Sequence, residues 1–210
     1  MGDILIFTWP QLVPLLIIYS GVMFFRYRKR ETSFIQQIVY LSFFIYCVLV
    51  ISETFLPIPI SKRYIQMIIE SNTAQQNKFI PFSDIYRLVM ANPNHLVDVI
   101  LKQIGGNILL LFPLGFYAPI IWKRFNKTKS VIFLGFAVSS GIELTQLFIS
   151  SILGVTYRSF VFDDITLNTL GVLLGYYFFK LIRPFLISII KSIDTPSNEN
   201  LKLLNLWRDL

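Results

Sequence analysis

The sequence predicts an all-α integral membrane protein with about five transmembrane helices. Hydrophobic residues make up 54% of the 210 residues and charged residues 15%, whereas a soluble domain carries about 25% charged residues. The apolar residues are gathered into segments of about 20 residues, the length that a helix needs to cross a bilayer. Two of these segments are followed by short basic stretches, which are typical of cytoplasmic loops. We therefore expect a multi-pass protein of the cell membrane.

Prolines and charged residues delimit the five segments that we expect to cross the membrane. They run from about Ile4 to Phe25, Phe34 to Leu56, Ile104 to Trp122, Val131 to Leu153 and Asp164 to Ile190. The first has no basic stretch ahead of it and no cleavage site after it, so we expect it to be retained as a helix. The basic stretches at 26–30 and 123–129 should face the cytoplasm, which places the N-terminus outside and the C-terminus inside.

The connection from about Ile58 to Lys102 then faces outward, and loops of that length usually carry structure of their own. Apolar residues recur at near-helical spacing from Ser83 to Met90 and from Leu96 to Lys102, so we expect short helices on the outer membrane surface. The final stretch, LKLLNLWRDL, is amphipathic and should also lie on the membrane. We divide the chain into a two-helix membrane segment at 1–78, a membrane domain at 79–185 and a polar tail at 186–210.

Composition also excludes several classes of function. The net charge of +7 comes from basic residues beside apolar segments, which indicates membrane topology and no nucleic-acid partner. Cys47 is the only cysteine, so an internal disulfide and a cysteine metal cluster are excluded. Nucleotide-binding and hydrolase motifs are absent, and we expect no cofactor. Glu143, Asp163 and Asp164 carry oxygen ligands for a hard cation, but they follow no motif of fixed spacing, so we expect no metal.

Polar residues in the fourth segment share one helical face. Glu143 lies roughly 15 Å below the expected outer end of that segment, at about 1.5 Å per residue. Gln146 is one turn nearer the outside, and positions i and i+3 are neighbours on a helix surface. Ionisable groups within membrane-length segments are costly and by default mark a functional site.

The fifth segment carries a matching stripe. Asp164, Asn168, Gly171 and Gly175 follow spacings of four, three and four, which places polar side chains at the outer end and small residues below them. The last two form a G-x-x-x-G pattern that lets another helix approach closely.

We predict an outward-facing polar pocket, with Glu53 at a similar depth and seven candidate ligand-binding residues: Asn107, Glu143, Gln146, Arg158, Asp163, Asp164 and Asn168. Each also has a purely structural interpretation. Glu143 and Arg158 would form an ion pair that fixes the outer loop. The amide side chains would make hydrogen bonds between helices. Asp164 would cap the fifth helix.

Several of these residues stand in motifs that resemble the VanZ-like family. The motifs are GGNILLLFPLGF at 105–116, ELTQ at 143–146, and Arg158-x-Phe160 leading to Asp163-Asp164 and NTLG at 168–171. The apolar Ile80-Pro81-Phe82 resembles an element of the family's outer loop, and the likeness covers about Phe79 to Ile182. Many members carry an acidic residue three positions after the arginine, where this chain has Val161.

The resemblance implies a membrane protein of Gram-positive bacteria, and the name-giving member is associated with low-level teicoplanin resistance. Our leading hypothesis is a non-enzymatic envelope protein whose pocket engages a lipid-linked or cell-wall-related ligand and so reduces the access of lipoglycopeptide antibiotics. Arg158 would meet an anionic headgroup, since guanidinium matches phosphate geometry. Glu143 and Gln146 would orient Arg158, and membrane lipids, a cell-wall precursor or a lipoglycopeptide would be the partners.

Two other functions stay open at this point. A membrane-surface enzyme would use Glu143 as general acid or base on a lipid headgroup. A lipid or proton-coupled transporter would use the carboxylates as a proton relay, although five helices without visible repeats argue against it.

Overall fold

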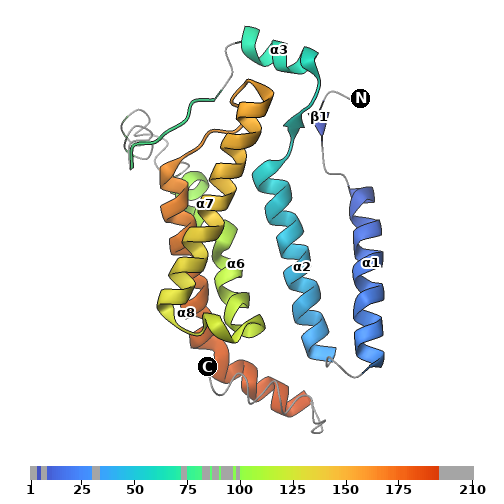
Figure 1. Ribbon diagram of the computed structural model, residues 1–210. Helices are drawn as coiled ribbons and strands as arrows, with labels where there is room; N and C mark the ends of the chain where they lie inside the picture. The colour runs from blue at the N-terminus through green and yellow to red at the C-terminus, as the bar shows by residue number, and fades with distance from the viewer. Residues whose placement is uncertain are drawn as a thin grey trace.

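The computed structural model of the chain describes residues 4–5, 9–29, 34–71, 75–81, 86, 90, 97 and 100–193 (Figure 1). Its helices are α1 (Trp9–Arg28), α2 (Phe34–Phe55), α3 (Lys62–Glu70), the π-helix η2 (Ile100–Gly105), α6 (Gly106–Ile121), the 3-10 helix η3 (Lys123–Phe125), α7 (Thr128–Leu153) and α8 (Phe162–Ile193). The short strands β1 (Ile4–Leu5) and β2 (Ile58–Pro59) pair antiparallel. The all-α membrane class predicted from the sequence is therefore confirmed.

Four helices among the described residues are long and apolar enough to cross a membrane: α2, the continuous helix 101–121, α7 and the stretch 162–189 of α8. Their bounds lie close to four of the expected segments, because each apolar run ends at a proline, a charged residue or a glycine. The expected first segment forms α1, which is not among those four. Five crossings and the orientation of the chain stay predictions.

Close packing of α6 against α8 forms the centre of the bundle. A Cβ atom on Gly171 would overlap the carbonyl oxygen of Ile108, and one on Gly175 would overlap that of Phe112. Gly115 on α6 lies equally close to the backbone of Val172 on α8. The G-x-x-x-G pattern therefore does allow the close helix approach that the sequence predicted.

Helix α2 packs on the outside of α6 through aromatic side chains. The Tyr117 ring lies 5.5 Å from the Phe43 ring and 6.3 Å from the Tyr46 ring. The Tyr46 hydroxyl also donates a 3.0 Å hydrogen bond to the carbonyl of Leu110. These contacts attach α2 to the bundle at two successive turns.

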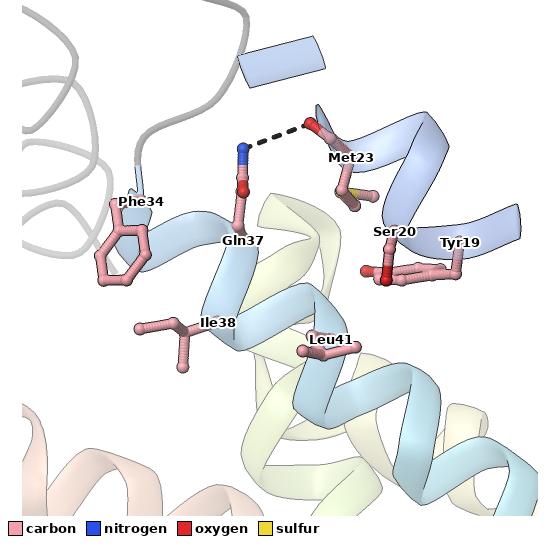
Figure 2. A pocket seen from close by; sticks show the side chains of 7 residues that line it. All are labelled: Tyr19, Ser20, Met23, Phe34, Gln37, Ile38 and Leu41. Atoms are coloured by element: carbon pink, nitrogen blue, oxygen red, sulfur yellow. Dashed lines mark hydrogen bonds between the residues drawn. The ribbon is translucent and has the colours of Figure 1, made fainter. Parts of the chain in front are cut away.

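Helix α1 lies beyond α2, away from the three-helix bundle (Figure 1). Figure 2 shows the cleft of about 300 Å³ between the two helices, lined by Tyr19, Ser20, Met23, Phe34, Gln37, Ile38 and Leu41. Gln37 crosses it with a 3.3 Å hydrogen bond to the carbonyl of Met23, and the Tyr19 ring stacks on Phe44 at 4.5 Å. None of the described residues that line this cleft is charged.

The two ends of the molecule differ in character. The end of α1, the start of α2 and the turn η3 lie together at one end, and α3 lies at the other (Figure 1). The last turn of α1 contains Arg28, and η3 contains Lys123 and Arg124, so both elements at this end carry basic residues. That agrees with the orientation predicted from the basic stretches. The expected surface helices from Ser83 to Met90 and from Leu96 to Lys102 fall partly outside the described residues, and the amphipathic stretch 201–210 falls wholly outside them.

Candidate functional site

A polar cavity of about 250 Å³ lies between the C-terminal end of α2, the first turns of α6 and α8, and the second half of α7. It is lined by Glu53 and Thr54 of α2, Lys102 and Gln103 of η2, Gly106, Asn107 and Leu110 of α6, Ile142, Glu143 and Gln146 of α7, Arg158, and Asp164 and Asn168 of α8. Three carboxylates and two cations thus face one volume. So many charges inside a membrane-helix bundle indicate a site, because burying each of them is costly.

The cavity has a buried floor and an exposed rim. We call Ile142, Glu143, Gln146 and Asn168 the floor, because each is at most 8% exposed. We call Glu53, Lys102 and Gly106 the rim, since all three are exposed. Arg158 lies between the two and is half-buried.

Glu143 is fixed at the floor by the turn that joins α7 to α8. Its Oε2 atom accepts a 2.8 Å hydrogen bond from the backbone N–H of Val161. No described residue donates to Oε1, the other carboxylate oxygen. Oε2 therefore links α7 to the turn before α8, and Oε1 is available to a ligand.

Asn168 lies beside Glu143 and is held from α7. Its Nδ2 atom donates 3.0 Å to the hydroxyl of Ser139, one helical turn before Glu143, and that hydroxyl lies 3.4 Å from the carbonyl of Asp164. The Oδ1 atom of Asn168 is buried and has no hydrogen-bond partner among the described residues. Buried polar atoms are nearly always paired, so an unpaired one calls for a ligand or a water.

Asp164 faces the cavity from the first turn of α8 and is held by amides. Its Oδ1 atom accepts hydrogen bonds from Asn107 at 2.6 Å and from Gln103 at 3.3 Å. Asn107 donates in addition to the carbonyl of Gln103, at 2.9 Å. Gln103 belongs to the π-helix, a distortion that is frequent at functional sites.

Side chains of the α7–α8 hairpin bind the last three carbonyl groups of α2 and that of Leu56, the next residue. Arg158 donates from Nη2 to the carbonyls of Glu53 at 3.1 Å and Leu56 at 2.6 Å. Gln146 donates to that of Thr54 at 2.8 Å, and the Tyr157 hydroxyl donates to that of Phe55 at 3.3 Å. The last carbonyls of a helix lack hydrogen-bond donors within the helix. A cation near them also interacts favourably with the negative end of the helix dipole.

This arrangement differs from the roles that the sequence suggested. Glu143 and Gln146 do not orient Arg158, because each of the three side chains instead binds backbone of another segment. The expected ion pair between Glu143 and Arg158 is not formed in the described part of the chain. The sequence shows which side chains share a helix face, but it does not show which backbone groups of other segments those side chains will contact.

The turn ahead of α8 is also held from the connection between α3 and η2. Residues 75–78 run parallel to 156–162, with Lys78 and Val161 as bridge partners. The side chains of Gln75 and Asn77 accept from the backbone of Ser159 and Phe160, at 3.0 and 2.8 Å. Val161, where many VanZ-like proteins have an acid, is 5% exposed and contacts Glu143 through its backbone.

Six of the seven residues that the sequence singled out line the cavity: Asn107, Glu143, Gln146, Arg158, Asp164 and Asn168. Asp163 is buried beside them but does not line it. Sequence reasoning missed Thr54, Lys102, Gln103, Gly106, Leu110 and Ile142, which line it as well. Gln103 precedes Asn107 by four residues, and that spacing was the one signal available for it.

Comparisons with known proteins agree with the motifs. A family model described as VanZ/LLP1 matches residues 43–183, which include most of α2 and all of the cavity-lining residues. No curated protein and no solved structure matches the chain. Since the match covers more than half of the sequence, the chain belongs to the VanZ/LLP1 family.

Proposed function

We propose that the cavity engages the headgroup of a lipid-linked or cell-envelope ligand on the outer side of the cell membrane. Engagement of that ligand would lower the access of glycopeptide and lipoglycopeptide antibiotics such as teicoplanin. Family membership supports this function, because the name-giving member is associated with teicoplanin resistance. The basic residues at the opposite end of the bundle support the outward orientation of the cavity.

One observation carries the proposal: a buried carboxylate, Glu143, stands at the floor of a cavity whose rim is charged. A structural ion pair would bury Glu143 against a cation, but its described partner is a backbone N–H. The surrounding helices present apolar side chains, such as Leu109 at 68% exposed and Phe148 at 65% exposed. A lipid-anchored ligand could lie along such a surface and place only its headgroup in the cavity.

Antibiotic susceptibility of cells tests the proposal. We would express the chain in a susceptible Gram-positive host and measure the teicoplanin concentration that stops growth, for wild type and for Glu143→Gln. Glu70→Gln is the matched control, because Glu70 is an exposed residue of α3 outside the cavity. Protection by wild type and by Glu70→Gln, with loss in Glu143→Gln at equal membrane abundance, is the expected result. Equal protection by all three would rule out the cavity as the functional site.

Enzymatic action on a lipid headgroup is a second candidate, favoured by the available Oε1 atom of Glu143. A carboxylate that faces a cavity and is held by one hydrogen bond is placed to move a proton to or from a bound group. Purified protein would then change the composition of envelope lipids on incubation, and Glu143→Gln would abolish the change. Unaltered lipids after incubation with wild type would exclude this function.

A further inference from the structure

We infer that the cavity selects a zwitterionic lipid headgroup that carries a primary ammonium group, with the ammonium at the floor and the phosphate near the rim. The inference rests on the proposed function and specifies its ligand. It follows from the hydrogen-bonding capacity that the protein leaves unused at each level of the cavity.

The amide donors that line the cavity are already bound to protein acceptors. Gln146 donates to the carbonyl of Thr54, and Asn168 donates to the hydroxyl of Ser139. Asn107 donates to both Gln103 and Asp164. Gln146 and Asn168 each use one of their two N–H groups in these bonds, so the donors left at the floor are neutral amides, and none of them carries a positive charge.

The acceptors at the floor, in contrast, are incompletely used. Oδ1 of Asn168 has no partner among the described residues, and no described residue donates to Oε1 of Glu143. One of these groups is a carboxylate and the other is a buried amide oxygen. A primary ammonium group brings three N–H donors and a positive charge, so it satisfies both. A phosphate at the same place would face the carboxylate and would be repelled.

The cations lie higher in the cavity. Lys102 is at the exposed rim, and Arg158 is half-buried below it. The hydrogen bonds of Arg158 to Glu53 and Leu56 use Nη2, and no described residue accepts from Nη1 or Nε, which can bind a phosphate oxygen. Glu53 shares the rim, and Asp164 is half-buried like Arg158 with its Oδ1 atom bound by Asn107 and Gln103, so among the described residues two cations and two carboxylates lie above the floor. Both cations thus lie above the floor, where they can meet a phosphate, and the charge at the floor is that of the Glu143 carboxylate, which can meet an ammonium group.

Cavity size agrees with a small ligand group. The volume of about 250 Å³ lies below the range of about 300–1,000 Å³ that is common for drug-sized ligands. A phosphoethanolamine group fits this description. A phosphocholine group has the same charges, but its quaternary nitrogen has no N–H donor and leaves both acceptors at the floor unpaired.

The test compares three lipids with identical acyl chains: phosphatidylethanolamine, phosphatidylcholine and phosphatidylglycerol. Full-length protein in lipid nanodiscs is released into detergent, and the retained lipid is measured by native mass spectrometry. We expect phosphatidylethanolamine to be retained roughly tenfold more than either of the others, the ratio that one charge-assisted contact supplies. Equal retention of all three, or preference for phosphatidylglycerol, would overturn the inference.

Variants make the assignment specific to the floor. Glu143→Gln keeps an oxygen for the N–H of Val161 but loses the negative charge, so the preference for phosphatidylethanolamine over phosphatidylcholine should disappear. Glu70→Gln should retain it. If Glu143→Gln is not monodisperse and helical, Asn168→Leu replaces it, and the same loss is expected. A preference that survives in both floor variants would contradict the placement of the ammonium group.

The outcome is separable from that of the proposed function. Antibiotic protection that depends on Glu143, without any preference for phosphatidylethanolamine, contradicts the headgroup assignment but supports the proposed function. A clear preference for phosphatidylethanolamine without antibiotic protection contradicts the proposed function but supports the headgroup assignment. Binding of Mg²⁺ alone, dependent on Glu143 and without lipid preference, would identify the floor as a cation site and refute the headgroup.

Discussion

Glu143 of α7 accepts a 2.8 Å hydrogen bond from the backbone N–H of Val161, the residue that immediately precedes α8. This contact links the start of α8 to α7. It also leaves the carboxylate facing the cavity, so one side chain serves both the fold and the site.

The two functions of Glu143 can be separated by substitution. Glu143→Gln retains an acceptor for Val161, whereas Glu143→Ala leaves a buried N–H unpaired, which costs about 1–3 kcal/mol. We therefore expect Glu143→Ala to have the lower thermal stability in detergent. Both variants should lose the ligand. Equal melting temperatures for the two would show that the hydrogen bond contributes little.

Removal of the guanidinium should release the end of α2. Arg158→Ala frees the carbonyls of Glu53 and Leu56, and we expect a loss of about 1–3 kcal/mol in the free energy of unfolding. Hydrogen exchange of the backbone amides near residue 56 should accelerate. Arg63→Ala, an exposed arginine of α3, is the control. Unchanged exchange in Arg158→Ala would mean that the remaining bonds from Gln146 and Tyr157 suffice.

Glycines in contact with α6 should tolerate no side chain. Gly171→Ala places a methyl group against the backbone of Ile108, so we expect little folded protein. Gly141→Ala is the control, because nothing lies within 4 Å of a Cβ there and alanine favours a helix by about 1 kcal/mol over glycine. Size-exclusion profiles and melting curves measure the difference. A folded Gly171→Ala protein would show that α6 and α8 can separate without loss of structure.

Tyr157 provides a test by pH. Burial raises the pKa of its hydroxyl above the ordinary value, while the nearby Arg158 lowers it in part. Arg158→Ala should therefore raise the pKa further, as measured by ultraviolet difference titration against Tyr157→Phe. Because the pKa is higher in the folded state, the stability that Tyr157 contributes is present at neutral pH and is lost as the pH rises through its titration. A pKa that falls in Arg158→Ala would contradict the contact between them.

The helices and the depth of the site were predictable because both follow from spacing along the chain. Apolar runs gave α7 and α8 to within a few residues, and helical periodicity brought Glu143, Gln146, Asp164 and Asn168 to one region. The partners of these side chains were not predictable, because most are backbone groups that a sequence pattern does not mark.

Other parts of the site were missed for the same physical reason. Thr54 lines the cavity because α2 ends there, and Gln103 lines it because a π-helix turns it toward Asp164. Asp163, in contrast, adjoins Asp164 in sequence, but successive residues of a helix point in different directions. Family membership was predictable, since the motifs at 105–116, 143–146 and 158–171 keep their order within the matched residues 43–183.

The bonds at the end of α2 also bear on how the protein is made. Helix α2 leaves the ribosome long before its partners, because Gln146 follows Thr54 by 92 residues and Arg158 follows Glu53 by 105. During synthesis these carbonyls gain their protein donors only after the α7–α8 hairpin has been made. Formation of α2 and completion of the cavity are therefore separate events, and a ribosome arrested between them should hold a chain in which α2 is complete and the cavity does not yet exist.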